Sequence, residues 1–315
     1  MHSRPPASAY AAAVGMTVAF GLSFVATKYA LRGFEPLLLA LLRFALAGGI
    51  LWVVWRFRRG PQRVSRGELG RLAVLGFVSL TVYFSFENLG IARTSASEAA
   101  ILIATIPLFV VILNTFTLRE HNTARQGAGI ALCFAGIAAL VLLGGSGAGG
   151  GSLTGNLLVL AASLSAGVYS ILARRLLVSR PALFVTTFQN LFGALFMLPL
   201  ALAEAALVGV RHPTPRASGG LLFLTVVCSI TAYLLLNYAF RFIPASKVAV
   251  FINLTPIVAV ASAYVLLGER FTPGQAAAAV VVVAGVWLTN SGIVAMSMAA
   301  SEALVRAIPR FSKLK

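Results

Sequence analysis

Long apolar stretches separated by short polar segments run through the sequence to about position 294. A helix that crosses a hydrocarbon core of about 30 Å needs roughly 20 apolar residues. Apolar residues lie all round each stretch, without the alternation that is typical of outer-membrane barrel strands. The pattern therefore predicts ten membrane-spanning helices, at 10–31, 36–55, 70–91, 95–117, 124–143, 154–174, 181–203, 219–240, 245–267 and 272–294.

Composition supports a membrane protein. Hydrophobic residues make up 59% of the 315 residues and charged residues only 10%, whereas soluble domains carry about 25% charged residues. The net charge of +17 does not indicate nucleic acid, because the cations stand singly between apolar stretches. The two cysteines, Cys133 and Cys228, lie in apolar runs and form no secreted disulfide framework. We therefore predict an all-α polytopic protein whose partner is the lipid bilayer, with no nucleic acid.

Lysine and arginine are distributed unequally between the two sides of the predicted bundle. Eighteen fall on the side that holds the N-terminus, six fall on the other side, and Arg43 lies within a span. Cytoplasmic segments carry an excess of these residues. We therefore expect a multi-pass protein of the inner (plasma) membrane with both termini in the cytoplasm.

The two halves of the chain repeat each other. Polar and proline residues match in one register, 149 positions apart, and the matched pairs include Asn88 with Asn237, Pro107 with Pro256, Glu120 with Glu269 and Gln126 with Gln275. A glycine- and serine-rich linker separates the halves. The predicted parts are a cytoplasmic N-terminus at 1–9, a first repeat at 10–143, the linker at 144–153, a second repeat at 154–294 and a basic cytoplasmic tail at 295–315.

Each predicted half holds five spans, which is an odd number. The second half must then enter the membrane from the opposite side, so the halves become inverted repeats related by a pseudo-two-fold axis in the membrane plane. Many secondary transporters have this arrangement and bind their substrate near the midplane, between the repeats. Rocking of one repeat against the other would open such a site alternately to each side.

Three segments carry a family resemblance. They are RTSASEAAIL…P…LRE at 93–120, IPASKVAVF…P…LGER at 243–270 and LLRFALAG in the second span. The chain resembles the EamA-type family of the drug/metabolite transporter superfamily over residues 10–294. The resemblance implies an exporter of amino acids or similar small metabolites, with spans 1–4 and 6–9 around a central cavity and spans 5 and 10 at the periphery. An uptake permease or exchanger for sugar phosphates, nucleotide sugars or other metabolites is the alternative.

Arg43 is the one deeply placed cation of the predicted spans. Burying arginine at a helix centre costs about 2.5–3.5 kcal/mol on insertion scales, so its side chain should face protein or water. Two interpretations stay open, a cation that attracts a substrate carboxylate and a structural pair with Glu87 or Glu98. The corresponding region of the second half carries Gln189 and Asn190 instead.

Glu87 and Asn88 lie near the outer end of the third span. Apolar surroundings disfavour the charged form of a carboxylate, so Glu87 is a candidate proton carrier; the alternative is a carboxylate held by Arg93 or Lys28. Asn88 and its counterpart Asn237 are candidates either for helix–helix hydrogen bonds or for substrate contact.

Glu98 and Lys247 occupy equivalent positions near the starts of spans 4 and 9. Ser95 or Thr94 is expected to cap the first of these helices, where Glu98 would complement the helix dipole. Lys247 gains nothing from that dipole, and it can extend to the cytoplasmic interface. Both residues stay open to a structural or a cavity role.

Two prolines and an edge carboxylate complete the polar pattern. Pro107 and Pro256 fall within predicted spans, where proline removes a backbone hydrogen bond, so we expect bends that shape or gate a cavity. Glu269 lies next to Arg270, and we expect an ion pair at the membrane edge.

The candidate cavity residues share polarity within a span. They are Arg43, Tyr83, Glu87, Asn88, Glu98, Tyr169, Gln189, Asn190, Tyr233, Asn237 and Lys247.

No catalytic or metal-binding motif accompanies the cavity candidates. The sequence has no aspartate, no HExxH, CxxC or GxSxG motif and no ATP-binding loop. We therefore expect no enzyme, no metal and no cofactor, with energy coming from a proton or an exchanged solute. A stripe of small residues in span 5, Gly127, Ala131, Ala135 and Ala139, predicts close packing within the chain or in a homodimer.

Overall fold

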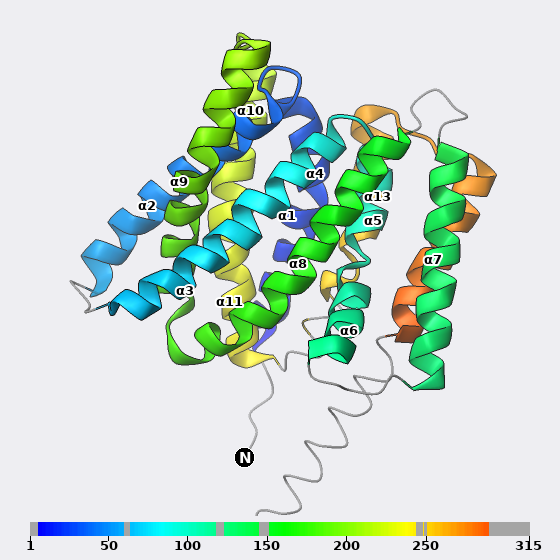
Figure 1. Ribbon diagram of the computed structural model, residues 1–315, viewed down its shortest axis with the longest axis horizontal. Helices are drawn as coiled ribbons and strands as arrows, with labels where there is room; N and C mark the ends of the chain where they lie inside the picture. The colour runs from blue at the N-terminus through cyan, green and yellow to red at the C-terminus, as the bar shows by residue number, and fades with distance from the viewer. Residues whose placement is uncertain are drawn as a thin grey trace, which may run out of the picture.

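The computed structural model describes residues 6–59, 64–117, 123–144, 151–243, 248 and 251–289, and these form helices and short connections without strands (Figure 1). The elements are α1 (Ala7–Ala30), α2 (Pro36–Arg59), α3 (Arg66–Gly76), η1 (Phe77–Val82), α4 (Tyr83–Ile91), α5 (Ala96–Ile103), α6 (Ile106–Thr117), α7 (Ala124–Gly144), α8 (Leu153–Ser179), α9 (Ala182–Val208), α10 (Pro215–Leu222), η2 (Phe223–Ala232), α11 (Tyr233–Phe242), α13 (Thr255–Leu267) and an apolar helix at Pro273–Thr289.

Eight helical stretches within the described residues are long and apolar enough to cross a membrane. They correspond to the first eight predicted spans. The last two predicted ranges contain the shorter apolar helices Thr255–Leu267 and Pro273–Thr289, and the adjoining residues 244–247 and 290–294 lie outside the described part. The multi-pass helical architecture is thus present, and the full count of ten spans stays a prediction.

Two of the spanning stretches contain π-helical segments. η1 joins α3 to α4, and η2 joins α10 to α11. Adding 149 to the bounds of η1, residues 77–82, gives 226–231, which lies inside η2 at 223–232. Segments of π-helix are rare and often accompany functional sites.

The helix breaks before the two matched prolines, Pro107 and Pro256, have the same hydrogen-bond pattern. Thr105 N donates to Leu102 O at 3.1 Å, and Leu254 N donates to Phe251 O at 3.0 Å. These two bonds are 149 positions apart. In each case a new helix starts just before the proline, α6 in the first half and α13 in the second.

Pro107 and Pro256 therefore do not bend a continuous helix, and that part of the expectation is wrong. Each is the second residue of a helix that follows an interruption. Proline fits this place because the first turn of a helix has N–H groups without intrahelical partners.

The starts of two other helices also match. Thr123 and Gln126 exchange hydrogen bonds before α7, with Thr123 N donating to Gln126 Oε1 at 2.9 Å. Thr272 and Gln275 make the same pair of bonds before the Pro273–Thr289 helix, again at 2.9 Å for the first. Such reciprocal capping satisfies backbone donors that the helix leaves unpaired.

The bundle packs in pairs of helices from the two halves. α2 lies along α9, α4 against α8, and α1 against α13, η2 and α11. α7 and the Pro273–Thr289 helix stand together at one edge of the bundle, opposite the edge formed by α2 and α3 (Figure 1).

Glycines bring α7 and the Pro273–Thr289 helix into contact. A Cβ added to Gly136 would lie 2.7 Å from Val282 N, and one added to Gly285 would lie 2.5 Å from Cys133 N. The predicted close packing within the chain is present, but other residues make it, since Gly127, Ala131 and Ala135 of the stripe are exposed in the single chain. The alternative, packing of the stripe in a homodimer, stays a prediction.

We predict that Gly136→Ala lowers the free energy of unfolding by about 1–3 kcal/mol, because the added methyl meets backbone that must move. Gly127→Ala is the matched control on the same helix, since no atom lies within 4 Å of an added Cβ there and alanine favours helix. Thermal unfolding of the purified protein in detergent measures both. Equal midpoints for the two variants would contradict the close contact.

Candidate substrate site

Arg43 is held inside the bundle by residues of both halves. The side chain is 6% exposed, and its Nε donates to the Ser229 hydroxyl at 2.8 Å. Its guanidinium carbon lies 4.7 Å from the ring centroid of Phe84 and 5.4 Å from that of Phe44. Aromatic faces attract cations, so the rings from the first half and the serine of η2 together fix the guanidinium.

Glu87 is buried in α4, three residues after Phe84, whose ring the cation faces. The Tyr83 hydroxyl donates to Glu87 Oε1 at 2.9 Å, and the Arg43 charge acts on the Glu87 carboxylate. Within the described residues, no ion pair of 4.0 Å or less joins Arg43 to Glu87, so the two interpretations of Arg43, a substrate anchor and a structural pair, both stay open. The alternative partner Arg93 donates instead to the carbonyl of Leu89.

The remaining polar side chains of the cluster come from α8, α9 and α11. Gln189 Nε2 donates to the Ser79 hydroxyl at 2.7 Å, and Tyr169 lies near enough to Gln189 for their side chains to interact. The ring of Tyr233 packs edge-on against Phe20 at a centroid distance of 5.7 Å. Tyr233 is within electrostatic reach of Arg43, Glu87 and Tyr169.

These side chains form what we call the central cluster: Arg43, Tyr83, Glu87, Tyr169, Gln189, Ser229 and Tyr233. It combines one guanidinium, one carboxylate, three phenols and neutral hydrogen-bonding groups in a buried setting. A guanidinium binds carboxylates in bidentate geometry, and a carboxylate can accept from an ammonium. Within the described residues, no group of three or more His, Cys, Asp or Glu side chains is placed to hold a metal ion.

Glu98 belongs to a different network. Its side chain is 0% exposed. Oε2 accepts from Thr94 at 3.0 Å and from Asn156 at 2.9 Å, while Oε1 accepts from Gln275 Nε2 at 3.0 Å and from Gly151 N at 3.3 Å. The structural interpretation of Glu98 fits these contacts, since the carboxylate joins α5 to α8 and to the Pro273–Thr289 helix.

The start of α5 is capped from within and from the second half. Ser95 Oγ accepts from Glu98 N at 3.0 Å, as expected for one of the two capping candidates. The Glu269 carboxylate accepts from Ala96 N and Ser97 N, both at 2.9 Å, and from the Ser97 hydroxyl at 2.7 Å. The expected ion pair between Glu269 and Arg270 is therefore wrong. The carboxylate instead lies at a helix N-terminus, where it accepts from N–H groups that have no partner within the helix.

The asparagine candidates make helix contacts. Asn88 Nδ2 donates to Pro36 O at 2.9 Å, and Asn190 Nδ2 donates to Thr186 O at 2.8 Å. In both, the side-chain oxygen is buried and has no partner in the described part of the chain. Asn237 lies in α11, but its side chain is outside the described part, and Lys247 lies outside it altogether.

Sequence reasoning missed Ser79 and Ser229. Both lie in the π-helical segments and accept hydrogen bonds from candidate residues. The Ser79 hydroxyl accepts from Gln189, and the Ser229 hydroxyl accepts from Arg43. A serine within a membrane span is ordinarily a packing residue, and nothing in the local sequence distinguishes these two from other small residues. Their role becomes apparent only when facing helices are placed together.

Comparison with protein families decides the class of the molecule. The model of the EamA-like transporter family matches residues 7–142 and 153–291. The chain belongs to the EamA-like transporter family. It is thus a multi-pass membrane transporter and not an enzyme, and the resemblance drawn from its sequence motifs is confirmed.

Similar proteins from several organisms are also transporters by name. The chain is 30% identical to an uncharacterized transporter of Archaeoglobus fulgidus, over 85% of this chain and 92% of that protein. It is 30% identical to a probable amino-acid metabolite efflux pump of Salmonella typhimurium, covering 88% and 93%. It is 29% identical to a probable terminal-alkyne amino-acid exporter of Streptantibioticus cattleyicolor, covering 87% and 90%.

A solved crystal structure shares the fold. It superposes with a TM-score of 0.60 over 91% of this chain and 98% of its own, at 19% sequence identity.

We predict that Glu98→Gln lowers the free energy of unfolding by about 2–4 kcal/mol, because an amide NH₂ would face donors that now bond to a buried carboxylate oxygen. Glu87→Gln is the matched control. Glu87 accepts from the Tyr83 hydroxyl, whereas Glu98 accepts from four groups, so the control should lose less stability. Thermal unfolding in detergent compares them, and a larger loss in Glu87→Gln would refute the structural role of Glu98.

Proposed function

We propose that this protein is a secondary-active inner-membrane exporter of amino acids or similar small metabolites, which works by alternating access around the central cluster. The observation that carries the proposal is that Arg43 and Glu87 belong to one buried cluster to which both halves of the chain contribute: Arg43 contacts Ser229 and the Phe84 ring, and Tyr83, which packs on Phe84, donates to Glu87. The two relatives named as a probable amino-acid exporter and a probable efflux pump for amino-acid metabolites support the same substrate class.

In the proposed complex, the guanidinium of Arg43 binds the carboxylate of the substrate. The carboxylate of Glu87 accepts from the substrate's ammonium group. The phenols of Tyr83, Tyr169 and Tyr233 line the space between with hydroxyl groups and ring faces. Opposite charges side by side suit a zwitterion, because each charged group of the ligand replaces lost hydration with a charged partner.

Alternating access is supported by the repeated features of the two halves. The π-helical segments, the helix breaks and the capping pairs recur 149 positions apart. The family model also matches two separate stretches, one in each half. With five spans in each half, the repeats are inverted, and broken helices near the midplane are typical of the substrate sites of such transporters.

The alternative substrate class, sugar phosphates or nucleotide sugars, fits the central cluster less well. A phosphate carries up to two negative charges, and the cluster holds one guanidinium next to a carboxylate. Export of a zwitterion leaves the cluster electrically balanced. Coupling to a proton or to an exchanged solute, with both termini in the cytoplasm, completes the proposal.

Counterflow in proteoliposomes tests it. The purified protein is reconstituted, loaded with one unlabelled amino acid, and assayed for uptake of a panel of radiolabelled amino acids with and without a pH gradient. We expect exchange of at least one free amino acid and loss of exchange for its methyl ester and its N-acetyl form, which lack one of the two charges. Exchange of sugar phosphates instead would overturn the proposal in favour of the alternative.

We predict that Arg43→Gln weakens the apparent affinity for the transported amino acid about 10- to 100-fold, since it removes a charge-assisted hydrogen bond. Arg43→Lys keeps the charge but loses the planar fork, and Ser229→Ala keeps the whole guanidinium but removes the hydroxyl that orients it. Both should fall between wild type and Arg43→Gln in counterflow. An Arg43→Gln protein that folds and keeps full affinity would rule out the anchor.

We predict that Glu87→Gln abolishes the response of transport to a pH gradient, because an amide cannot take up or release a proton at this place. Tyr83→Phe, which removes the hydroxyl that donates to Glu87, leaves the carboxylate present and should keep the response. Uptake measured under an imposed gradient distinguishes the two variants. An unchanged gradient response in Glu87→Gln would exclude this residue as the proton carrier.

A further inference from the structure

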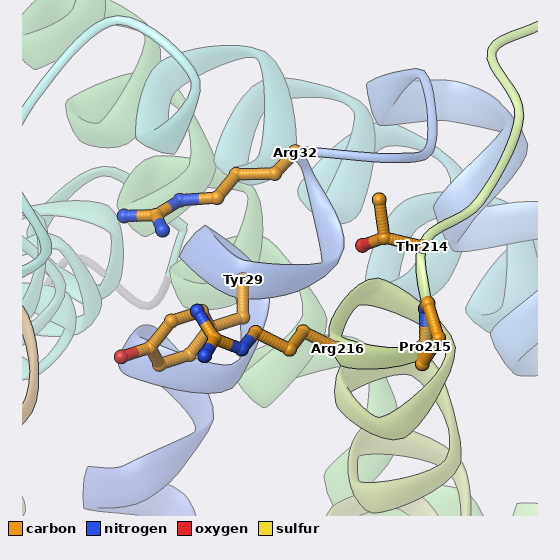
Figure 2. Close-up of a pocket in the computed structure, with 5 residues that line it drawn as sticks. All are labelled: Tyr29, Arg32, Thr214, Pro215 and Arg216. Carbon is orange, nitrogen blue, oxygen red and sulfur yellow. The ribbon is translucent and has the colours of Figure 1, made fainter.

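A cavity lies away from the central cluster, where α1 ends and α10 begins. Its volume is about 460 Å³, and it is lined by Tyr29, Arg32, Thr214, Pro215 and Arg216. Figure 2 shows the side chains of Arg32 and Arg216 extending toward the Tyr29 ring from two different elements. The cavity is therefore bordered by two positive charges and one aromatic ring.

The aromatic ring is held in place. The Tyr29 hydroxyl donates to Leu266 O at 2.7 Å, which ties the end of α1 to the end of α13. The guanidinium carbon of Arg32 lies 5.0 Å from the centroid of the Tyr29 ring. A cation over an aromatic face is attracted to it, so Tyr29 orients the Arg32 guanidinium at the cavity.

The positive charge at this cavity is not offset by an ion pair. In the part of the chain that the structure describes, Glu68 pairs with Arg180 and Glu35 with Arg211, and neither Arg32 nor Arg216 has a carboxylate within ion-pair distance. The Lys28 ammonium lies close enough to Arg32 for their charges to act on each other. An anion beside the Arg32 guanidinium would reduce the repulsion between Arg32 and Lys28.

The nearby carboxylates are already engaged. Glu269 and Glu98 act on Lys28, but Glu269 caps the start of α5 and the oxygens of Glu98 accept from four protein groups. Neither is free to move to the cavity without exposing donors that it now satisfies. Glu35, three residues after Arg32, pairs with Arg211. Within the described part of the chain, no carboxylate therefore lines the cavity, and we consider an anion from outside the chain.

We propose that Arg32 and Arg216 bind the phosphate group of an anionic phospholipid. The cavity lies at the ends of two membrane-spanning stretches, Ala7–Ala30 and Pro215–Leu236, and this is the depth at which phospholipid headgroups lie. Guanidinium groups bind phosphate in bidentate geometry, and tyrosine is enriched at the same interface. The site is separate from the central cluster and does not depend on which solute is transported.

The test measures binding in neutral detergent through the thermal unfolding midpoint. Dioctanoyl phosphatidylglycerol is titrated into the purified protein, with dioctanoyl phosphatidylcholine and inorganic phosphate in parallel arms. One basic side chain near an anionic lipid is worth about a fivefold change in affinity. We therefore expect Arg32→Gln and Arg216→Gln each to weaken the phosphatidylglycerol response about fivefold, and the double variant about 25-fold.

Arg270→Gln is the matched control, because Arg270 is an exposed arginine that does not line this cavity. Its lipid response should stay at the wild-type level. The pocket arginines are exposed, so their variants should unfold at the wild-type midpoint without lipid, which keeps the comparison valid.

The outcomes separate the sources of the phosphate. A response to phosphatidylglycerol alone that the pocket variants lose supports the lipid site. A response to inorganic phosphate that the same variants lose supports a phosphate site but overturns the lipid as its occupant. Equal responses to phosphatidylcholine and phosphatidylglycerol, or equal losses in Arg270→Gln and the pocket variants, would overturn the site altogether.

Discussion

Within a bilayer, a polar group that leaves water is costly unless it finds a partner inside the protein, and this constraint governs how the two halves of the chain are joined. Glu269 and Glu204 illustrate it. The first caps α5 from the opposite half, and the second accepts from Leu37 N and Leu38 N at the start of α2. These carboxylates satisfy helix N-termini that carry partial positive charge, so the ends of the helices and the contacts between the halves depend on the same hydrogen bonds.

The charged groups of the central cluster also have partners inside the protein, but Arg43 and Glu87 each keep part of their hydrogen-bonding capacity. Arg43 gives one N–H to Ser229 and faces two aromatic rings, which hold the cation without neutralising it. Glu87 accepts from Tyr83, which hydrogen-bonds the carboxylate without removing its charge. By contrast, Glu98 is surrounded by donors on both oxygens. The proposed site and the structural network around Glu98 therefore differ in how completely the hydrogen-bonding capacity of a buried charged group is satisfied.

Much of this fold could be predicted from the sequence, because span length and the positions of prolines are local properties. The first eight spans and the register of 149 residues between the halves follow from apolar runs and from matched residues such as Pro107 and Pro256. What could not be predicted depends on residues far apart in the chain. Ser229 beside Arg43, and Glu269 at the start of α5, become partners only through packing. Arg43, Glu87 and Gln189 were predictable candidates because charged and strongly polar side chains within a span are costly. A serine within a span is common, so its presence there does not indicate a site.

The π-helical segments have a geometric consequence for the cluster. An α-helix turns by about 100° for each residue, and a π-helical turn accommodates one residue more than an α-turn. Every side chain beyond η1 is thereby rotated relative to an uninterrupted α-helix with the same start. Tyr83, Ser85 and Glu87 are the first polar side chains after η1, so the direction in which Tyr83 and Glu87 point is set by a wider backbone ring upstream. The rotation of α4 about its axis, and not the identity of its side chains alone, therefore turns Glu87 toward the cluster that holds Arg43.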